Sequence, residues 1–102
     1  MYKIKPTGQF KKDIKACSKA NYNLSLMATA IDILIDAGTL PFEEYQTHKL
    51  TGFKADIWDA HIKSDWLLLW RVEESDEPEY DGIIILLRTG THSNLFGKKQ
   101  YF

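Results

Sequence analysis

The sequence predicts an α+β fold in which two N-terminal helices pack on a mainly antiparallel four-stranded sheet, in the order βααβββ. Two helical patterns precede three runs of β-type residues, and a short β-type segment opens the chain. No repeat, linker or low-complexity tract interrupts these patterns. Residues 1–102 are therefore expected to form one domain with a single core.

The first strand is expected at residues 2–4, and the first helix follows it directly. Thr7 is a suitable N-cap, and Phe10, Ile14 and Cys17 recur at helical spacing. Cys17 is the single cysteine, so it can form neither an internal disulfide nor a cysteine-based zinc site. We expect it to pack in the core of a protein of the reducing cytoplasm.

The second helix is expected at about residues 23–37. Gly38 is well placed to end this helix, and Pro41 prevents it from resuming. The apolar residues of this segment predict the stripe that faces the core: Leu24, Met27, Ile31, Leu34 and Ile35.

Three strands are expected in the second half, at about residues 54–63, 66–73 and 82–88, after a polar loop (42–53) that contains His48. The first two are joined by a tight turn. The second link carries six acids between residues 73 and 81 and is interpreted as a solvated hairpin tip, which would repel RNA if it faced an active site.

The net charge of −1 is unevenly distributed. Residues 1–20 contain six lysines and one acid, and residues 88–102 contain three basic residues and no acid. These basic ends would bind a polyanion if they met in space, or the first helix simply has a solvated lysine face. The apolar stretches are too short to span a membrane, and no secretory leader is recognised.

Residues able to transfer protons cluster near the ends of two predicted strands. Asp59 and His61 share one strand face, where a carboxylate can orient an imidazole. If the last two strands form a hairpin, the end of the last strand returns to the level of the preceding turn. His61, Asp65, Arg88 and His92 are then expected to converge at one edge of the sheet.

Such a group suits RNA cleavage without a metal. A base takes the proton of the ribose 2′-OH, a cation stabilises charge on the phosphate, and an acid protonates the leaving 5′-oxygen. Phe96 is a candidate for stacking on a base. Two other readings are weaker: a two-histidine, one-carboxylate metal site of Asp59, His61 and either His92 or His48, and a Ser93–His92 hydrolase pair without a nucleophile elbow.

Three segments, residues 48–52, 59–68 and 88–96, together resemble the RelE superfamily of bacterial toxins, specifically its YafQ-like branch. The opening strand and two helices fit the same family order, so the resemblance covers nearly the whole chain. It implies a RelE-like microbial ribonuclease fold. It also implies a ribosome-dependent, metal-independent endoribonuclease that needs no cofactor.

The resemblance further implies the partners: mRNA in the ribosomal A site, ribosomal RNA, and a cognate antitoxin that forms a hetero-oligomer with the toxin in the cytoplasm, with no membrane involved. Carried over by position, the activity-critical residues are His48, His61, Asp65, His92 and Phe96. The substrate-contacting or supporting positions are Arg88, Asp59 and Trp66. We expect His61 or His48 to act on the nucleophile and His92 on the leaving group.

Two other functions are compatible with the same architecture. A ParE-like toxin acts on DNA gyrase without being a nuclease, but that role does not need three histidines. An inactive module would only bind antitoxin. The chain also departs from the family in being nearly neutral, and it continues past Phe96 with a tail that is expected to touch ribosomal RNA or antitoxin, or to be an untethered end.

Overall fold

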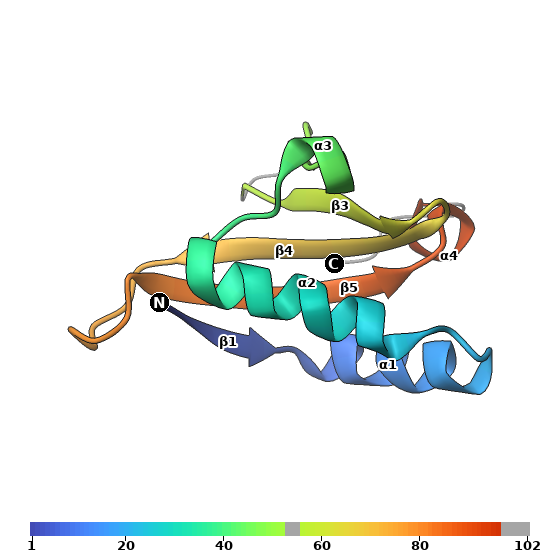
Figure 1. Ribbon diagram of the computed structural model, residues 1–102, viewed down its shortest axis with the longest axis horizontal. Coiled ribbons are helices and arrows are strands. Elements are labelled where there is room, and N and C mark those ends of the chain that lie inside the picture. Colours follow the sequence, from blue (N-terminus) through green and yellow to red (C-terminus); the bar gives the residue numbers. More distant parts are fainter. Residues whose placement is uncertain (53–55, 97–102) are drawn as a thin grey trace.

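The computed structural model describes residues 1–52 and 56–96, which form a five-stranded sheet with two long helices across one side (Figure 1). The elements in chain order are β1 (Tyr2–Pro6), α1 (Gly8–Lys19), α2 (Leu24–Ala37), α3 (Phe42–Tyr45), β2 (His48–Lys49), β3 (Trp58–Lys63), β4 (Trp66–Glu73), β5 (Gly82–Gly90) and α4 (His92–Phe96).

The strand order in the sheet is β1-β5-β4-β3-β2. Strand β1 runs parallel to β5, and the other three pairings are antiparallel. The expected α+β class and the mainly antiparallel sheet are confirmed, but the expected count of four strands is wrong. The fifth strand, β2, lies in the segment that was expected to be only a polar loop.

The differences in detail have local causes. A two-residue strand such as β2 is too short to show an alternating pattern, and the one-turn helices α3 and α4 are too short to show helical periodicity. Strand β3 begins at Trp58, whereas the expected strand began near residue 54; residues 54 and 55 of that expectation lie outside the described residues.

The caps of the long helices agree with the sequence. The backbone N–H of Phe10 donates to Thr7 Oγ1, which caps α1. Asn23 caps α2, and Gly38 ends it in the left-handed region at φ 78°, with its N–H bonded to Leu34 O.

Apolar packing occurs on both faces of the sheet. The larger core lies between the helices and the sheet and includes Phe10, Cys17, Met27, Leu34 and Trp70. Of the expected stripe on α2, Leu24 and Ile31 also pack there, whereas Ile35 does not join the cluster of described residues. Ala30, which was not expected, does.

A smaller core lies on the sheet face turned away from α1 and α2. Its buried members are Ile57, Leu67, Leu69 and Leu95. Leu95 comes from α4, so this short helix is held against the sheet by its own apolar residue. The face that carries the functional candidates is therefore packed and rigid beneath them.

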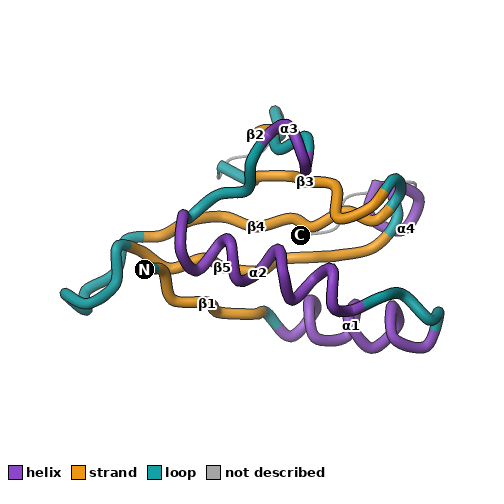
Figure 2. Tube along the Cα trace, in the orientation of Figure 1, coloured by secondary structure: helices purple, strands orange, loops and turns teal. Residues whose placement is uncertain are grey.

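The acidic link between β4 and β5 and the helix α4 lie at opposite ends of the sheet (Figure 2). The register agrees, because Glu73 pairs with Ile83 at one end of the β4–β5 ladder and Leu67 pairs with Gly90 at the other. The acids of this link therefore lie away from α4. In the described part of the chain, the helices are too short or too polar to cross a membrane.

Candidate active site

Strand register brings distant candidates into one row across the sheet. His48 pairs with Asp59, Asp59 with Leu69, and Leu69 with Arg88. Directly opposed residues of paired strands have side chains on the same face. His61, two residues after Asp59, lies on that face in the next row.

Helix α4 adds the third histidine. The His61 and His92 ring centroids are 5.6 Å apart, and the His92 and Phe96 ring centroids are 6.5 Å apart. Thr91 and Asn94 hold the start of the helix, since the Asn94 N–H donates to Thr91 Oγ1 and the Thr91 hydroxyl donates to Asn94 Oδ1. The turn after β5 therefore points His92 back toward His61.

Asp65 in the β3–β4 turn fixes the orientation of His92. Its Oδ1 accepts the His92 backbone N–H at 3.1 Å and lies 2.7 Å from His92 Nδ1. These contacts lower the pKa of Asp65, the backbone hydrogen bond most of all. An ionised carboxylate can only accept, so we assign the proton between them to His92 Nδ1, and Nε2 remains for chemistry.

Asp59 is a buried carboxylate beside His48. His48 Nε2 lies 3.5 Å from Asp59 Oδ2, and His48 Nδ1 lies 3.1 Å from the carbonyl oxygen of Gln46. Burial raises the pKa of Asp59, and the charges of the three histidines oppose that shift. Both ring nitrogens of His48 are thus engaged, whereas His61 Nδ1 has no hydrogen-bond partner among the described residues.

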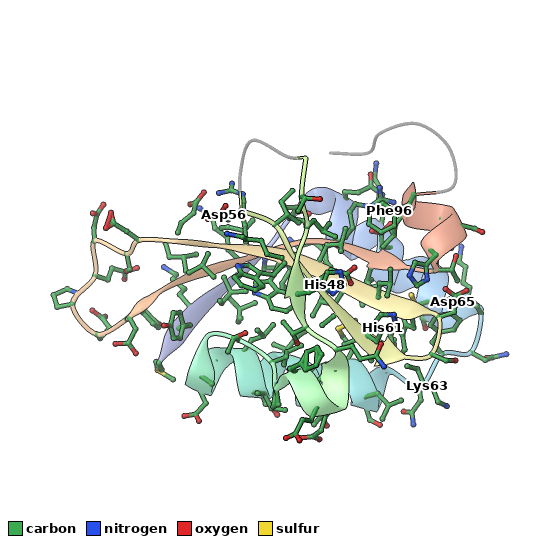
Figure 3. The ribbon with its side chains drawn as sticks, turned by 90° about the horizontal axis from the view of Figure 1, so that it is seen from above. His48, Asp56, His61, Lys63, Asp65 and Phe96 are labelled. Atoms are coloured by element: carbon green, nitrogen blue, oxygen red, sulfur yellow. The ribbon has the colours of Figure 1, made fainter. Side chains whose placement is uncertain are left out.

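Figure 3 shows His48, His61 and Asp65 within one region of the molecule, with Phe96 on α4 beside it. The structure therefore brings together His48, Asp59, His61, Asp65, His92 and Phe96. They come from β2, β3, the following turn and α4. One exposed face of the sheet thus gathers three imidazoles, two carboxylates and an aromatic ring.

Arg88 shares the row of Asp59, but its guanidinium turns toward helix α1. Arg88 Nε donates to Asp13 Oδ2 at 2.8 Å and Nη2 donates to Asp13 Oδ1 at 3.3 Å. The same carboxylate accepts a hydrogen bond from the Thr89 N–H at 3.1 Å. This N–H is available because β1 pairs with β5 only as far as Leu86. Asp13 was not among the expected site residues, because its position on the lysine-rich helix gives no signal of this role.

Trp66 is the other expected site residue that the structure does not bring to the histidines. It is buried at 4% exposure in the larger core, on the helix side of the sheet. Its Nε1 donates to Thr89 Oγ1, and that hydroxyl donates to the carbonyl oxygen of Leu67. Trp66 therefore contacts the strands that carry the site.

The alternative metal site has no support in the arrangement of ligands. Within residues 1–52 and 56–96, no group of three or more His, Cys, Asp or Glu side chains is placed to hold a metal ion. In particular, Asp59 lies within ion-pair distance of His48, and His92 is bonded to Asp65.

Comparisons with known proteins identify a family with this sequence and this architecture. A family model described as bacterial toxin of type II toxin-antitoxin system, YafQ, matches residues 2–97. The mRNA interferase toxin YafQ of Escherichia coli K12 is 33% identical over 95 residues, which cover 92% of this chain and 95% of that protein.

Solved structures show the same likeness. The E. coli DinJ–YafQ complex contains a chain with a TM-score of 0.76 and 31% identity, covering 95% of this chain and 100% of that one. A metal-bound toxin from Helicobacter pylori gives a TM-score of 0.78 at 29% identity, covering 94% of this chain and 100% of that one. The resemblance expected from the sequence is confirmed: the chain belongs to the YafQ family of bacterial toxins of type II toxin–antitoxin systems.

Proposed function

We propose that this toxin is an endoribonuclease that inhibits translation by cutting mRNA in the ribosomal A site, with histidines as general acid and base and without a metal. The E. coli relative is named an mRNA interferase. The observation that carries the proposal is the pair of adjacent imidazoles, His61 and His92, with ring centroids 5.6 Å apart. A phosphodiester that lies against both rings has a proton acceptor and a proton donor within reach.

The reaction is transesterification within the RNA. A base removes the proton of the ribose 2′-OH, and the 2′-oxygen forms a bond to phosphorus. The bond from phosphorus to the 5′-oxygen of the next nucleotide breaks, and an acid protonates that oxygen. The products are a 2′,3′-cyclic phosphate and a 5′-hydroxyl, and no electron or further reactant is needed.

His92 is the acid in this proposal. Asp65 holds its Nδ1 proton and stabilises the imidazolium form, so Nε2 is free to donate to the leaving oxygen. His61 is the base in this proposal, because neither of its ring nitrogens is hydrogen-bonded to a described residue. Its Nδ1 is buried, so Nε2 is the nitrogen that accepts the proton. His48 has both nitrogens engaged, by Gln46 O and Asp59, and acts by holding charge next to the phosphate.

The remaining candidates bind rather than transfer protons. Phe96 stacks on a base next to the cut, a contact that contributes about 1–3 kcal/mol in single-strand binders. Arg88 contacts a phosphate through the part of its guanidinium that Asp13 does not occupy. Asp59 orients His48, and Trp66 supports the strand ends from the helix side.

The partners follow from the same reading. An antitoxin binds the toxin in a hetero-oligomer, as the DinJ–YafQ complex suggests for this family. On the ribosome, ribosomal RNA meets the lysine-rich helix α1, while the acidic β4–β5 link points away from α4 and the histidines. The toxin acts in the cytoplasm.

Induced expression with and without a co-expressed antitoxin tests this function. We expect growth arrest with the wild type, relief by the antitoxin, and mRNA ends that map to ribosomes. His92→Ala is expected to abolish both arrest and cleavage. Arrest with intact mRNA and stalled replication would instead support a gyrase poison, and cleavage that EDTA abolishes would contradict the metal-independent mechanism.

The roles of the histidines need a separate experiment. An RNA with a 5′-thio leaving group does not need a proton donor at that atom. We expect this substrate to restore cleavage by His92→Ala but not by His61→Ala or His48→Ala. Equal rescue of the three variants, or rescue of His61→Ala alone, would overturn the assignment.

A further inference from the structure

A cavity adjoins the histidine site at Asp65. Its volume is about 370 Å³, and its walls come from the α1–α2 turn and the β3–β4 turn. Asn21 and Tyr22 line one side, and Lys63, Asp65 and Trp66 line the other. Asp65 also binds His92, so this cavity, which we call the Asn21 pocket, and the proposed cleavage site share one residue.

The size and walls of the Asn21 pocket suit one planar ring system. Its volume is at the lower end of the range of about 300–1,000 Å³ that is usual for small-molecule sites. The Tyr22 ring packs edge-on against Trp66, with centroids 4.9 Å apart, and the Trp66 Nε1 bond to Thr89 fixes the indole. Trp66 is itself buried, so the half-buried Tyr22 ring, which Trp66 holds in place, is the aromatic surface that an unpaired base would stack on.

Polar groups in the Asn21 pocket remain available for recognition. Among the described residues, neither the Asn21 amide nor the Tyr22 hydroxyl takes part in a hydrogen bond. An amide both donates and accepts, so it can pair with the edge of a base. Lys63, at the same end of the sheet as Asp65, places a cation beside the pocket for the adjoining phosphate (Figure 3).

We infer that the Asn21 pocket holds one nucleobase of the RNA next to the scissile phosphate, and that Asn21 sets part of the sequence preference. This inference rests on the proposed function, because it places the cut at the neighbouring histidines. It adds a substrate subsite on the helix side of Asp65, formed by the turn between α1 and α2.

Asn21 also has a structural role that the test must separate. It adopts φ 62° at the end of α1, and its N–H donates to Ser18 O at 3.0 Å. Glycine adopts this conformation without strain, so Asn21→Gly removes the amide and keeps the backbone turn. Asn21→Asp keeps the side-chain size but replaces the amino donor with an acceptor.

The first arm maps mRNA ends on ribosomes for the wild type and both variants. With Asn21→Gly, we expect the base preference at one position next to the cut to weaken at least about fivefold. Preferences at the other positions, which serve as the control, are expected to remain. With Asn21→Asp, the preference at that position should shift toward guanine, because its N1–H and its N2 amino group can both donate to a carboxylate. Unchanged preferences in both variants, with the melting temperature preserved, would overturn the inference.

The second arm measures binding without cleavage. NMR spectra of the toxin are recorded with AMP, CMP, GMP or UMP, and with inorganic phosphate as the control. We expect shifts at Asn21 and Tyr22 with at least one nucleotide, none of that pattern with phosphate, and loss of the response in Asn21→Gly. Nucleotide binding at the Asn21 pocket without mRNA cleavage would support the pocket and refute the proposed function. Cleavage with no nucleotide response and unchanged preferences would support the proposed function and refute the pocket.

Discussion

Replacing Asp13 with alanine is expected to destabilise the protein strongly. The Asp13 carboxylate is only 10% exposed, and it accepts hydrogen bonds from the Arg88 guanidinium, the Thr89 N–H and the Gln9 amide. Removing one partner of a buried ion pair typically costs about 3–5 kcal/mol, because the other charge stays buried. With Arg88 at 14% exposure, we expect a loss near the lower limit, about 3 kcal/mol.

The assay is urea unfolding at neutral pH, with thermal melting as a second measurement. For a chain of this length, a loss of about 3 kcal/mol corresponds to a fall in melting temperature of roughly 12 °C. Glu77→Ala is the matched control, because Lys3 Nζ and Glu77 Oε1 are also 2.8 Å apart but both side chains are nearly half exposed. We expect no measurable loss there.

A compensating double variant separates charge burial from packing. In Asp13→Leu with Arg88→Met, no charge is buried. The exposed Gln9 amide can turn to water, whereas the Thr89 N–H loses its acceptor, at a cost of about 1–3 kcal/mol. We therefore expect the double variant to be more stable than Asp13→Ala. Equal stability of the two, or a loss in Asp13→Ala no larger than in the control, would refute the reasoning.

Three further predictions concern the carboxylates and one glycine. Burial raises the pKa of Asp59, so the stability that its carboxyl group contributes is present at low pH and is lost as pH rises through the raised pKa. We therefore expect Asp59→Asn to be more stable than the wild type at pH 7 but not at pH 3, and to be less active. Hydrogen bonds from His92 lower the pKa of Asp65, so the stability that this carboxylate contributes is present above about pH 4 and is lost below it. In urea titrations, the loss of unfolding free energy in Asp65→Asn should therefore become smaller as pH falls. Gly38→Ala should destabilise by at least about 1 kcal/mol, because φ is 78° and a Cβ would lie 2.5 Å from a tyrosine ring, whereas Gly8→Ala, with open space, should not.

The sequence predicts the parts of the fold that repeat a pattern. Caps at Thr7 and Gly38 and the alternation through β3 are visible because each is a local rule. The alternation places Asp59 and His61 on the face opposite Ala60, which packs in the larger core. Strand β2 is not visible, since its two residues gain their conformation only from pairing with β3.

The site was predicted less evenly. Convergence of His61, Asp65 and His92 follows from hairpin geometry and is found in the structure. The partner of Asp59 was not predictable, because the nearest imidazole in the sequence is His61 but pairing of β2 with β3 brings His48 within 3.5 Å instead. Asp13 was missed for a similar reason: it is 75 residues from Arg88, and only the early end of β1 opens the edge of β5 to it.

The two carboxylates of the site, Asp59 and Asp65, differ in burial, and we expect them to act differently on the histidines. Asp65 is exposed and ionised, so it can hold the proton of His92 without a large cost of desolvation. Asp59 is buried, so its charge is costly and is offset by His48, His61 and His92 together. The buried carboxylate interacts with all three imidazoles, whereas Asp65 interacts chiefly with His92, its hydrogen-bond partner, and for this reason we expect Asp59→Asn to alter the pH profile of cleavage more broadly than Asp65→Asn.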